Sequence, residues 1–132
     1  MTVKAWQTTA VAASVMLIAS TPLLAEEEDY GHLKMMQTPS GKVLTTPEGM
    51  TVYTYERDGD GVSNCNGECA KKWPPVLARP EDKPKGKLAI IKRADGTLQW
   101  ADEEEPLYTY IEDKRPGDVK GDNIGGVWHA AR

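Results

Sequence analysis

The hexapeptide Tyr53-Thr54-Tyr55-Glu56-Arg57-Asp58 decides the fold, because it returns as Tyr108-Thr109-Tyr110-Ile111-Glu112-Asp113. The same offset of 55 residues aligns further positions without a gap: Gly31 on Gly86, Leu33 on Leu88, Gly41 on Gly96, Glu48 on Glu103 and Trp73 on Trp128. Aromatic, glycine and aspartate positions that match in one register indicate a tandem repeat. We predict one unit over residues 31–73 and a second over residues 86–128.

Each unit has the pattern of short strands separated by Gly- and Pro-rich turns, which is typical of all-β domains. The predicted strands are 32–37, 42–45, 50–55, 87–92, 97–100, 107–111 and 127–131. One helical turn is predicted within 67–72, and an acidic loop over 101–106. A unit of three or four strands cannot bury its apolar face alone. We therefore predict an all-β fold of two tandem β-meander repeats, packed with pseudo-two-fold symmetry as a small sandwich or partly closed barrel.

Residues 1–25 have the features of a secretory signal peptide. Lys4 precedes an apolar run from Thr8 to Ser20, and Ala25 stands before an acidic stretch. The run is shorter than the roughly 20 residues that a membrane span needs. We expect cleavage after Ala25, leaving residues 26–132 as a single soluble domain in the periplasm or outside the cell, with no stable membrane anchor.

Composition and motifs narrow the function classes. The formal net charge is −4 and no basic patch is present, which argues against nucleic acid as a partner. The sequence contains no serine nucleophile motif, no His-Glu-x-x-His and no phosphate loop. We therefore predict a non-enzymatic binding or interaction module with no cofactor, whose partner is an unidentified protein or small molecule.

The residues that recur in both units are explained by the fold that both units share. Alternating tyrosines on a strand usually build the core and its cross-strand pairs. An aspartate just after a strand usually accepts hydrogen bonds from turn amides. We assign such structural roles to the eight repeated positions Tyr53, Tyr55, Asp58, Trp73, Tyr108, Tyr110, Asp113 and Trp128.

Cys65 and Cys69 occur only in the first unit. In an oxidising compartment they favour a structural disulfide. A thiol–disulfide redox site, or Cu(I) bound by the two thiolates with His32 or His129, is the alternative. Covalent haem is excluded because Cys-x-x-Cys-His is absent.

The first unit also contains Asp58-Gly59-Asp60-Gly61, which resembles the start of a calcium loop. The twelfth position of such a loop should be glutamate, but Cys69 stands there. A solvated turn explains the aspartates without a metal. Because the cysteine pair and these aspartates distinguish the first unit from the second, we expect any special function in residues 56–72.

The chain resembles the bacterial secreted repeat family, often described as predicted lipoproteins with a Yx(F/W/Y)xxD motif and of unknown function. The motif stands at Tyr53-x-Tyr55-x-x-Asp58 and Tyr108-x-Tyr110-x-x-Asp113, and Cys65-Asn66-Gly67-Glu68-Cys69-Ala70 and Trp73-Pro74-Pro75 also fit the family pattern. Many members have a lipid-modified cysteine after the signal, and this chain has none there. The resemblance implies a soluble periplasmic member and brings no established activity.

Overall fold

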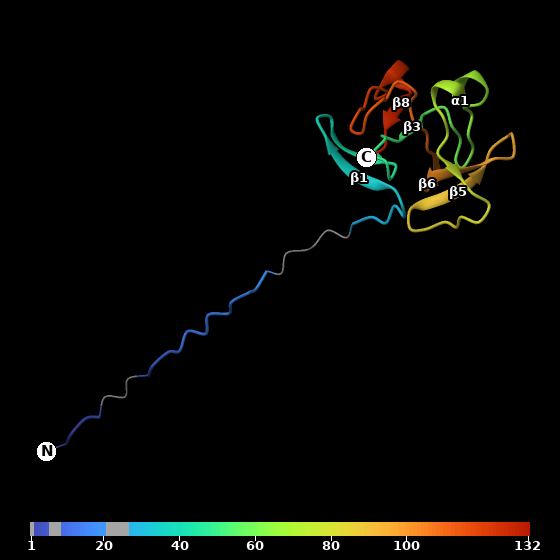
Figure 1. Cartoon of the computed structure of the whole chain (residues 1–132). Coiled ribbons are helices and arrows are strands. Elements are labelled where there is room, and N and C mark those ends of the chain that lie inside the picture. Colours follow the sequence, from blue (N-terminus) through green and yellow to red (C-terminus); the bar gives the residue numbers. More distant parts are fainter. Residues whose placement is uncertain (1, 6–8, 21–26) are drawn as a thin grey trace.

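The computed structural model describes residues 2–5, 9–20 and 27–132. Residues 2–5 and 9–20 form neither helix nor strand and are exposed, and they lie along a trace that leaves the folded part of the chain (Figure 1). Ala25 and Glu26, which flank the predicted cleavage site, lie outside the described residues. Among the residues described, no helix has the length and apolar character needed to cross a membrane.

Within residues 27–132, eight short strands form three small sheets, so this part of the chain is mostly β with little helix. The first sheet pairs β1 (Lys34–Thr38) with β2 (Gly41–Thr45), and the second pairs β3 (Tyr53–Tyr55) with β8 (Trp128–Ala130). The third has the order β4-β6-β5, with β7 on β6; the bounds are β4 Leu77–Ala78, β5 Leu88–Lys92, β6 Leu98–Asp102 and β7 Glu105–Pro106. Within the described chain these sheets do not close into a barrel.

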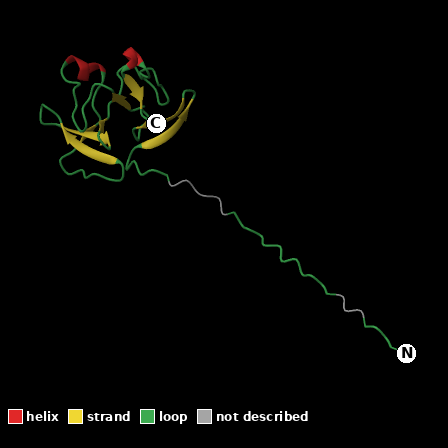
Figure 2. Cartoon of the chain, turned by 180° about the vertical axis from the view of Figure 1, so that it is seen from behind, coloured by secondary structure: helices red, strands yellow, loops and turns green. Residues whose placement is uncertain are grey.

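Two helical turns complete the domain. They are α1 (Glu68–Lys72) and the 3-10 turn η1 (Ile124–Gly126). Figure 2 shows both at the end of the domain opposite to the one where the N-terminal segment leaves it. The turn predicted within 67–72 is therefore present as α1, whereas η1 was not anticipated.

The two repeats interlock through their motif strands. Tyr53 and Tyr108 exchange both backbone hydrogen bonds, at 2.7 and 3.0 Å. On its other side the Tyr53 strand pairs with β8, the last strand of the second repeat. Tyr108 forms the corresponding bridge to Pro75, at the end of the first repeat. Each repeat therefore supplies the closing segment that pairs with the other repeat's motif strand.

The structure corrects three details of the sequence prediction. In the first hairpin Met35 pairs with Leu44, whereas in the second Ile90 pairs with Trp100, so the ungapped alignment slips by one residue. The cause is a turn of three residues between Arg93 and Thr97, which includes Gly96 at φ 86°. The predicted acidic loop 101–106 is largely occupied by the end of β6 and by β7, and 107–111 contains only isolated bridges at Tyr108.

The apolar side chains gather in two clusters. One contains Leu33, Leu88 and Trp100 with the inner side chains of both hairpins. The other contains Tyr53, Tyr108 and the tryptophans Trp73 and Trp128, all buried. Since both clusters draw residues from both repeats, neither repeat buries its apolar face by itself, as expected for units of this size.

Candidate functional site

The tyrosine of each motif is hydrogen-bonded to the aspartate of the other. The Tyr53 hydroxyl donates to Asp113 Oδ2 at 2.6 Å, and the Tyr108 hydroxyl donates to Asp58 Oδ2 at 2.7 Å. The second oxygen of Asp58 accepts the amide of Asn64 at 2.7 Å, and that of Asp113 accepts an amide in the matching turn. The turn amides follow from the sequence, but the tyrosine partners do not, because nothing in one repeat shows that its strand lies against the other.

Burial is the main cause of the pKa shifts in these pairs. It raises the pKa of Tyr53 and Tyr108 well above the usual range of a phenol, and it raises the pKa of Asp58 and Asp113. Both tyrosines are fully buried. The proton of each pair therefore stays on the phenol oxygen at neutral pH, where it serves the hydrogen bond.

Residues 63–69 of segment 56–72 are fixed by a disulfide and by a buried arginine. Cys65 and Cys69 form a disulfide with a Cα–Cα distance of 5.2 Å. Arg93, which follows β5 in the second repeat, is buried, and it donates to the Cys65 carbonyl oxygen at 2.8 Å and to Ser63 Oγ at 3.0 Å. A third bond joins Arg93 to Gln99 Oε1 at 2.8 Å. The segment is therefore a rigid part of the domain surface, and no sequence signal marks Arg93 as its anchor.

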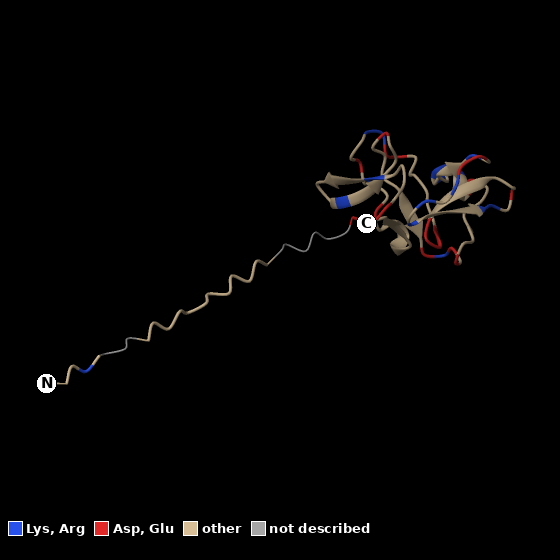
Figure 3. Cartoon of the chain, turned by 90° about the horizontal axis from the view of Figure 1, so that it is seen from below, with Lys and Arg blue, Asp and Glu red and all other residues tan. Residues whose placement is uncertain are grey.

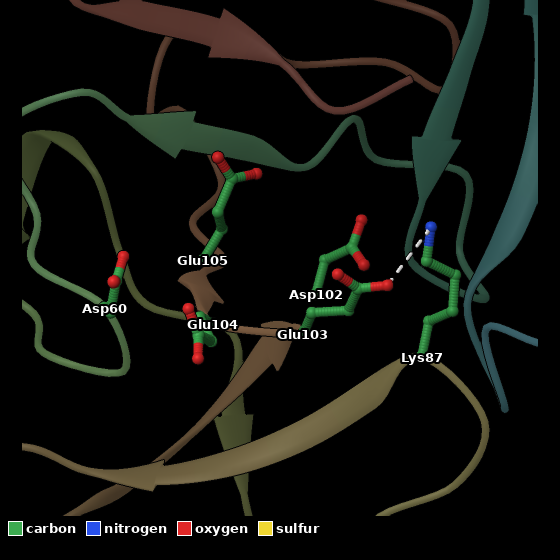
Figure 4. Close-up of a pocket in the computed structure, with 6 residues that line it drawn as sticks. All are labelled: Asp60, Lys87, Asp102, Glu103, Glu104 and Glu105. Carbon is green, nitrogen blue, oxygen red and sulfur yellow. Dashed lines mark ion pairs between the residues drawn. The ribbon is translucent and has the colours of Figure 1, made fainter.

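An open acidic pocket lies beside this segment. It has a volume of ≈ 400 Å³ and is lined by Lys87 and five carboxylates, Asp60, Asp102, Glu103, Glu104 and Glu105 (Figure 4). Asp60 comes from segment 56–72, Lys87 directly precedes β5, and the other four carboxylates come from β6, β7 and the turn between them. The Gly61 amide donates to the Glu104 carbonyl oxygen at 2.7 Å, which holds the two sides together. The largely exposed run 102–105 therefore lines one side of an open pocket.

A second pocket of ≈ 290 Å³ continues the first. It shares Asp60, Glu104 and Glu105 with it and adds Tyr55 and Glu56, among other residues. We call the two pockets together the acidic cleft. In Figure 3 the lysines and arginines are scattered over the domain rather than gathered on one side.

Most of the charge of the acidic cleft is not neutralised. Lys87 lies 3.1 Å from Glu28 and 3.7 Å from Glu103, and its hydrogen bond to Glu28 raises its pKa. Within residues 27–132, no ion pair involves the other four lining carboxylates. Burial raises the pKa of Asp102, and the negative charges of Glu103 and Glu105 add to this rise.

Replacing Asp102 by asparagine should stabilise the domain at pH 7. Because the pKa of Asp102 is raised on folding, its ionisation weakens the fold as the pH rises through that pKa. Asp102 is paired across the strands with Glu105, and relief of such a like-charge contact is worth about 0.2–1 kcal/mol. Urea unfolding should show this gain in unfolding free energy at pH 7. The gain should disappear below pH ~3, where the side chain at position 102 is neutral in the wild type as well as in the variant.

The exposed Glu81 in the linker offers a matched control. Glu81→Gln changes the net charge by the same amount. The difference between its unfolding free energies at the two pH values should stay near that of the wild type. A gain for Asp102→Asn that persists in acid would show that the effect is not electrostatic.

His32 and His129, the histidines of the alternative copper site, each contact another side chain. The His32 ring packs against Trp100 with 4.9 Å between ring centroids, and His129 Nε2 lies 2.8 Å from Glu56 Oε1. The two cysteine sulfurs are bonded to one another. Nowhere in the described part of the chain do three or more His, Cys, Asp or Glu side chains converge as a metal site would require.

The fold and its site define a class of small, mostly β proteins built from two interlocked repeats with one disulfide. A family described as a secreted repeat of unknown function matches residues 34–77 and 89–132, more than half of the chain. The chain belongs to this family. The two matched ranges are again 55 residues apart and extend past the predicted ends at 73 and 128. No curated protein and no solved structure matches the chain.

Proposed function

We propose that this chain is a non-enzymatic, periplasmic or secreted binding module, whose acidic cleft takes up a lysine- or arginine-rich segment of a partner protein. The observation that carries the proposal is the set of four carboxylates, Asp60, Asp102, Glu104 and Glu105, that share one open pocket without an ion-pair partner among the described residues. Uncompensated charge of one sign in a concave site attracts and orients ligands of the opposite sign.

The way the cleft is built supports this proposal. Four consecutive acidic residues in a tight turn repel one another, and Glu103 has a left-handed backbone conformation with φ 53°. Such conformations cost free energy and gather at functional sites. The opposite wall is held by the hydrogen bonds of Asp58 with Tyr108 and Asn64 and by the hydrogen bond from the Gly61 amide to Glu104, and a fixed wall lowers the entropy cost of binding. We further propose that the eight motif residues support this surface within two repeats related by an approximate two-fold axis.

A hexa-arginine peptide is the probe for the cleft. We expect calorimetric titration to show binding that weakens with added salt, and Glu104→Gln with Glu105→Gln to weaken it roughly three- to tenfold. Each exposed charge pair is worth about 0.2–1 kcal/mol, so the loss of two pairs spans roughly two- to thirtyfold, and the expected range lies in the middle of that span. Glu81→Gln with Glu112→Gln is the matched control, because both residues are exposed and lie outside the cleft.

Two results would count against the cleft. If the wild-type chain fails to bind the peptide at low salt, the proposal is wrong. If the control pair weakens binding as much as the cleft pair does, the peptide senses only the net charge of the protein.

The state of the cysteines separates this proposal from the alternative of a redox or copper-handling protein. We expect the mature chain to have an intact mass about 2 Da below that of its reduced form, because two thiol hydrogens are lost on oxidation. Closing a five-residue loop should stabilise the fold by about 2 kcal/mol, which reductive unfolding would measure. Free alkylation of both thiols in fresh periplasm, with protection by Cu(I), would favour the alternative. Single replacements of His32 and His129 would then identify a third ligand.

A further inference from the structure

Four aromatic rings form a continuous face-to-face column in the second core cluster. Tyr55 stacks on Trp128 with ring centroids 4.1 Å apart, and Trp128 stacks on Trp73 at 3.9 Å with an interplanar angle of 2°. Trp73 in turn stacks on Tyr110 at 4.2 Å. The two indoles are buried, whereas the two terminal tyrosines are partly exposed. The column therefore connects solvent to the interior at both of its ends.

Two further tyrosines meet the indoles edge-on. The Tyr53 ring lies 5.3 Å from Trp73 at 78°, and the Tyr108 ring lies 5.2 Å from Trp128 at 89°. Unlike the terminal rings, both are fully buried. These are the same tyrosines whose hydroxyls donate to Asp113 and Asp58. Each indole thus contacts a phenol that already has a carboxylate base at hydrogen-bond distance.

Indoles and phenols are the side chains that release a single electron most readily, and stacked rings pass the resulting charge to one another. A phenol gives up its electron at low cost only if its proton can leave at the same time. A positioned base provides that path, and geometry within about 2.6–3.2 Å is the first requirement for it. Packing against Gly121 keeps the rings in place, because a Cβ there would come within 2.7 Å of the Trp73 ring.

We propose that this aromatic cluster is a conduit and resting place for single oxidising equivalents, with Tyr53–Asp113 and Tyr108–Asp58 as its proton-coupled redox pairs. An external one-electron oxidant, such as a small inorganic radical, removes one electron at the column. The electron vacancy spreads over the stacked indoles. Tyr53 then gives an electron to the oxidised indole, while the hydroxyl proton of Tyr53 moves to Asp113 Oδ2. An external one-electron reductant, such as a small enediol or hydroquinone in solution, later gives an electron to the Tyr53 radical, and the proton moves back from Asp113 Oδ2 to the phenol oxygen.

The surroundings suit a reversible radical. A free thiol would donate a hydrogen atom to it, but both cysteines of the described chain are in the disulfide, and Cys65 lies in this same cluster. Full burial of Tyr53 and Tyr108 prevents their rings from coupling with those of a second molecule. The partly exposed Tyr55 and Tyr110 remain open to oxidants and reductants in solution.

Flash photolysis with tris(bipyridine)ruthenium(III) as oxidant tests the proposal. In the wild-type protein we expect the tryptophan radical spectrum to convert into a tyrosyl spectrum at a rate independent of protein concentration. The conversion should slow in deuterated water, because a proton moves with the electron. Absence of the conversion, or a conversion without an isotope effect, would overturn the proposal even if no variant folds.

Variants locate the resting site. Asp58→Asn with Asp113→Asn removes both bases, and we expect the conversion to be about a hundredfold slower, at the low end of what a positioned base contributes. Tyr55→Phe with Tyr110→Phe removes the two terminal phenols of the column, and a tyrosyl signal should still form, because the proposal places the radical on Tyr53 and Tyr108. Tyr30→Phe, outside the cluster, should also have no effect. An unchanged rate in the aspartate variant would contradict the assignment, and so would loss of the tyrosyl signal in the Tyr55 and Tyr110 variant, because the radical would then rest on a terminal ring.

Discussion

Replacing Tyr108 by alanine should lower the free energy of unfolding by about 3–5 kcal/mol, as large aromatic truncations in protein cores do. The side chain is fully buried, contacts Trp128 edge-on and donates a hydrogen bond from its hydroxyl group to Asp58. Its loss would leave a cavity between the repeats and an aspartate without its phenol partner. Urea denaturation followed by tryptophan fluorescence would measure the change.

Two further variants separate packing from hydrogen bonding. Tyr108→Phe keeps the ring and should cost about 1–3 kcal/mol, the penalty for leaving a buried polar group unpaired. Tyr110→Ala removes a ring that is only partly buried, so its effect should be smaller than that of Tyr108→Ala. Equal losses for Tyr108→Ala and Tyr110→Ala would mean that the motif tyrosines do not differ in their contribution to the core.

Much of the strand content was predictable because the repeat makes the periodic signal appear twice. The exchange of closing segments between the repeats was not predictable. An ungapped repeat has the same pattern whether a motif strand pairs within its own unit or with the other one. Tyr53 pairs with Ala130 and Tyr108 with Pro75, and these partners are identified only by the folded chain.

The second motif strand illustrates how a local residue overrides a repeated pattern. Tyr108-Thr109-Tyr110 matches the sequence of β3, yet it forms only isolated bridges. The segment beside it contains Pro74 and Pro75, whereas the corresponding segment beside β3 contains His129 and Ala130. Proline has no amide proton and cannot extend a ladder of hydrogen bonds. The prolines at this edge were visible in the sequence, but their partner was not.

The acidic cleft shows a different limit of sequence reasoning. The run 102–105 is usually read as a solvated loop, and Asp60 as part of a polar turn. The bond from the Gly61 amide to the Glu104 carbonyl oxygen brings them together. A contact between residues this far apart in the chain depends on the packing of both repeats, so neither segment alone contains a signal for it.

Replacing Arg93 by methionine should destabilise the domain by about 3 kcal/mol. Methionine has a similar length but would leave the Cys65 carbonyl oxygen, Ser63 Oγ and Gln99 Oε1 without the donors they now have. Each buried polar atom left unpaired costs about 1–3 kcal/mol. Part of this loss is offset, because the variant no longer has to bury a guanidinium charge.

The position of Arg93 also predicts where the damage appears. It joins the turn after β5 to segment 56–72, so hydrogen exchange should accelerate at the amides of 63–69 before it does so in the hairpin of β1 and β2. Arg115→Met, at an exposed position, is the matched control and should stay within about 0.5 kcal/mol of the wild type. If Arg93→Met also stays within that limit, the disulfide is sufficient to hold residues 63–69, and the buried arginine is dispensable for this part of the fold.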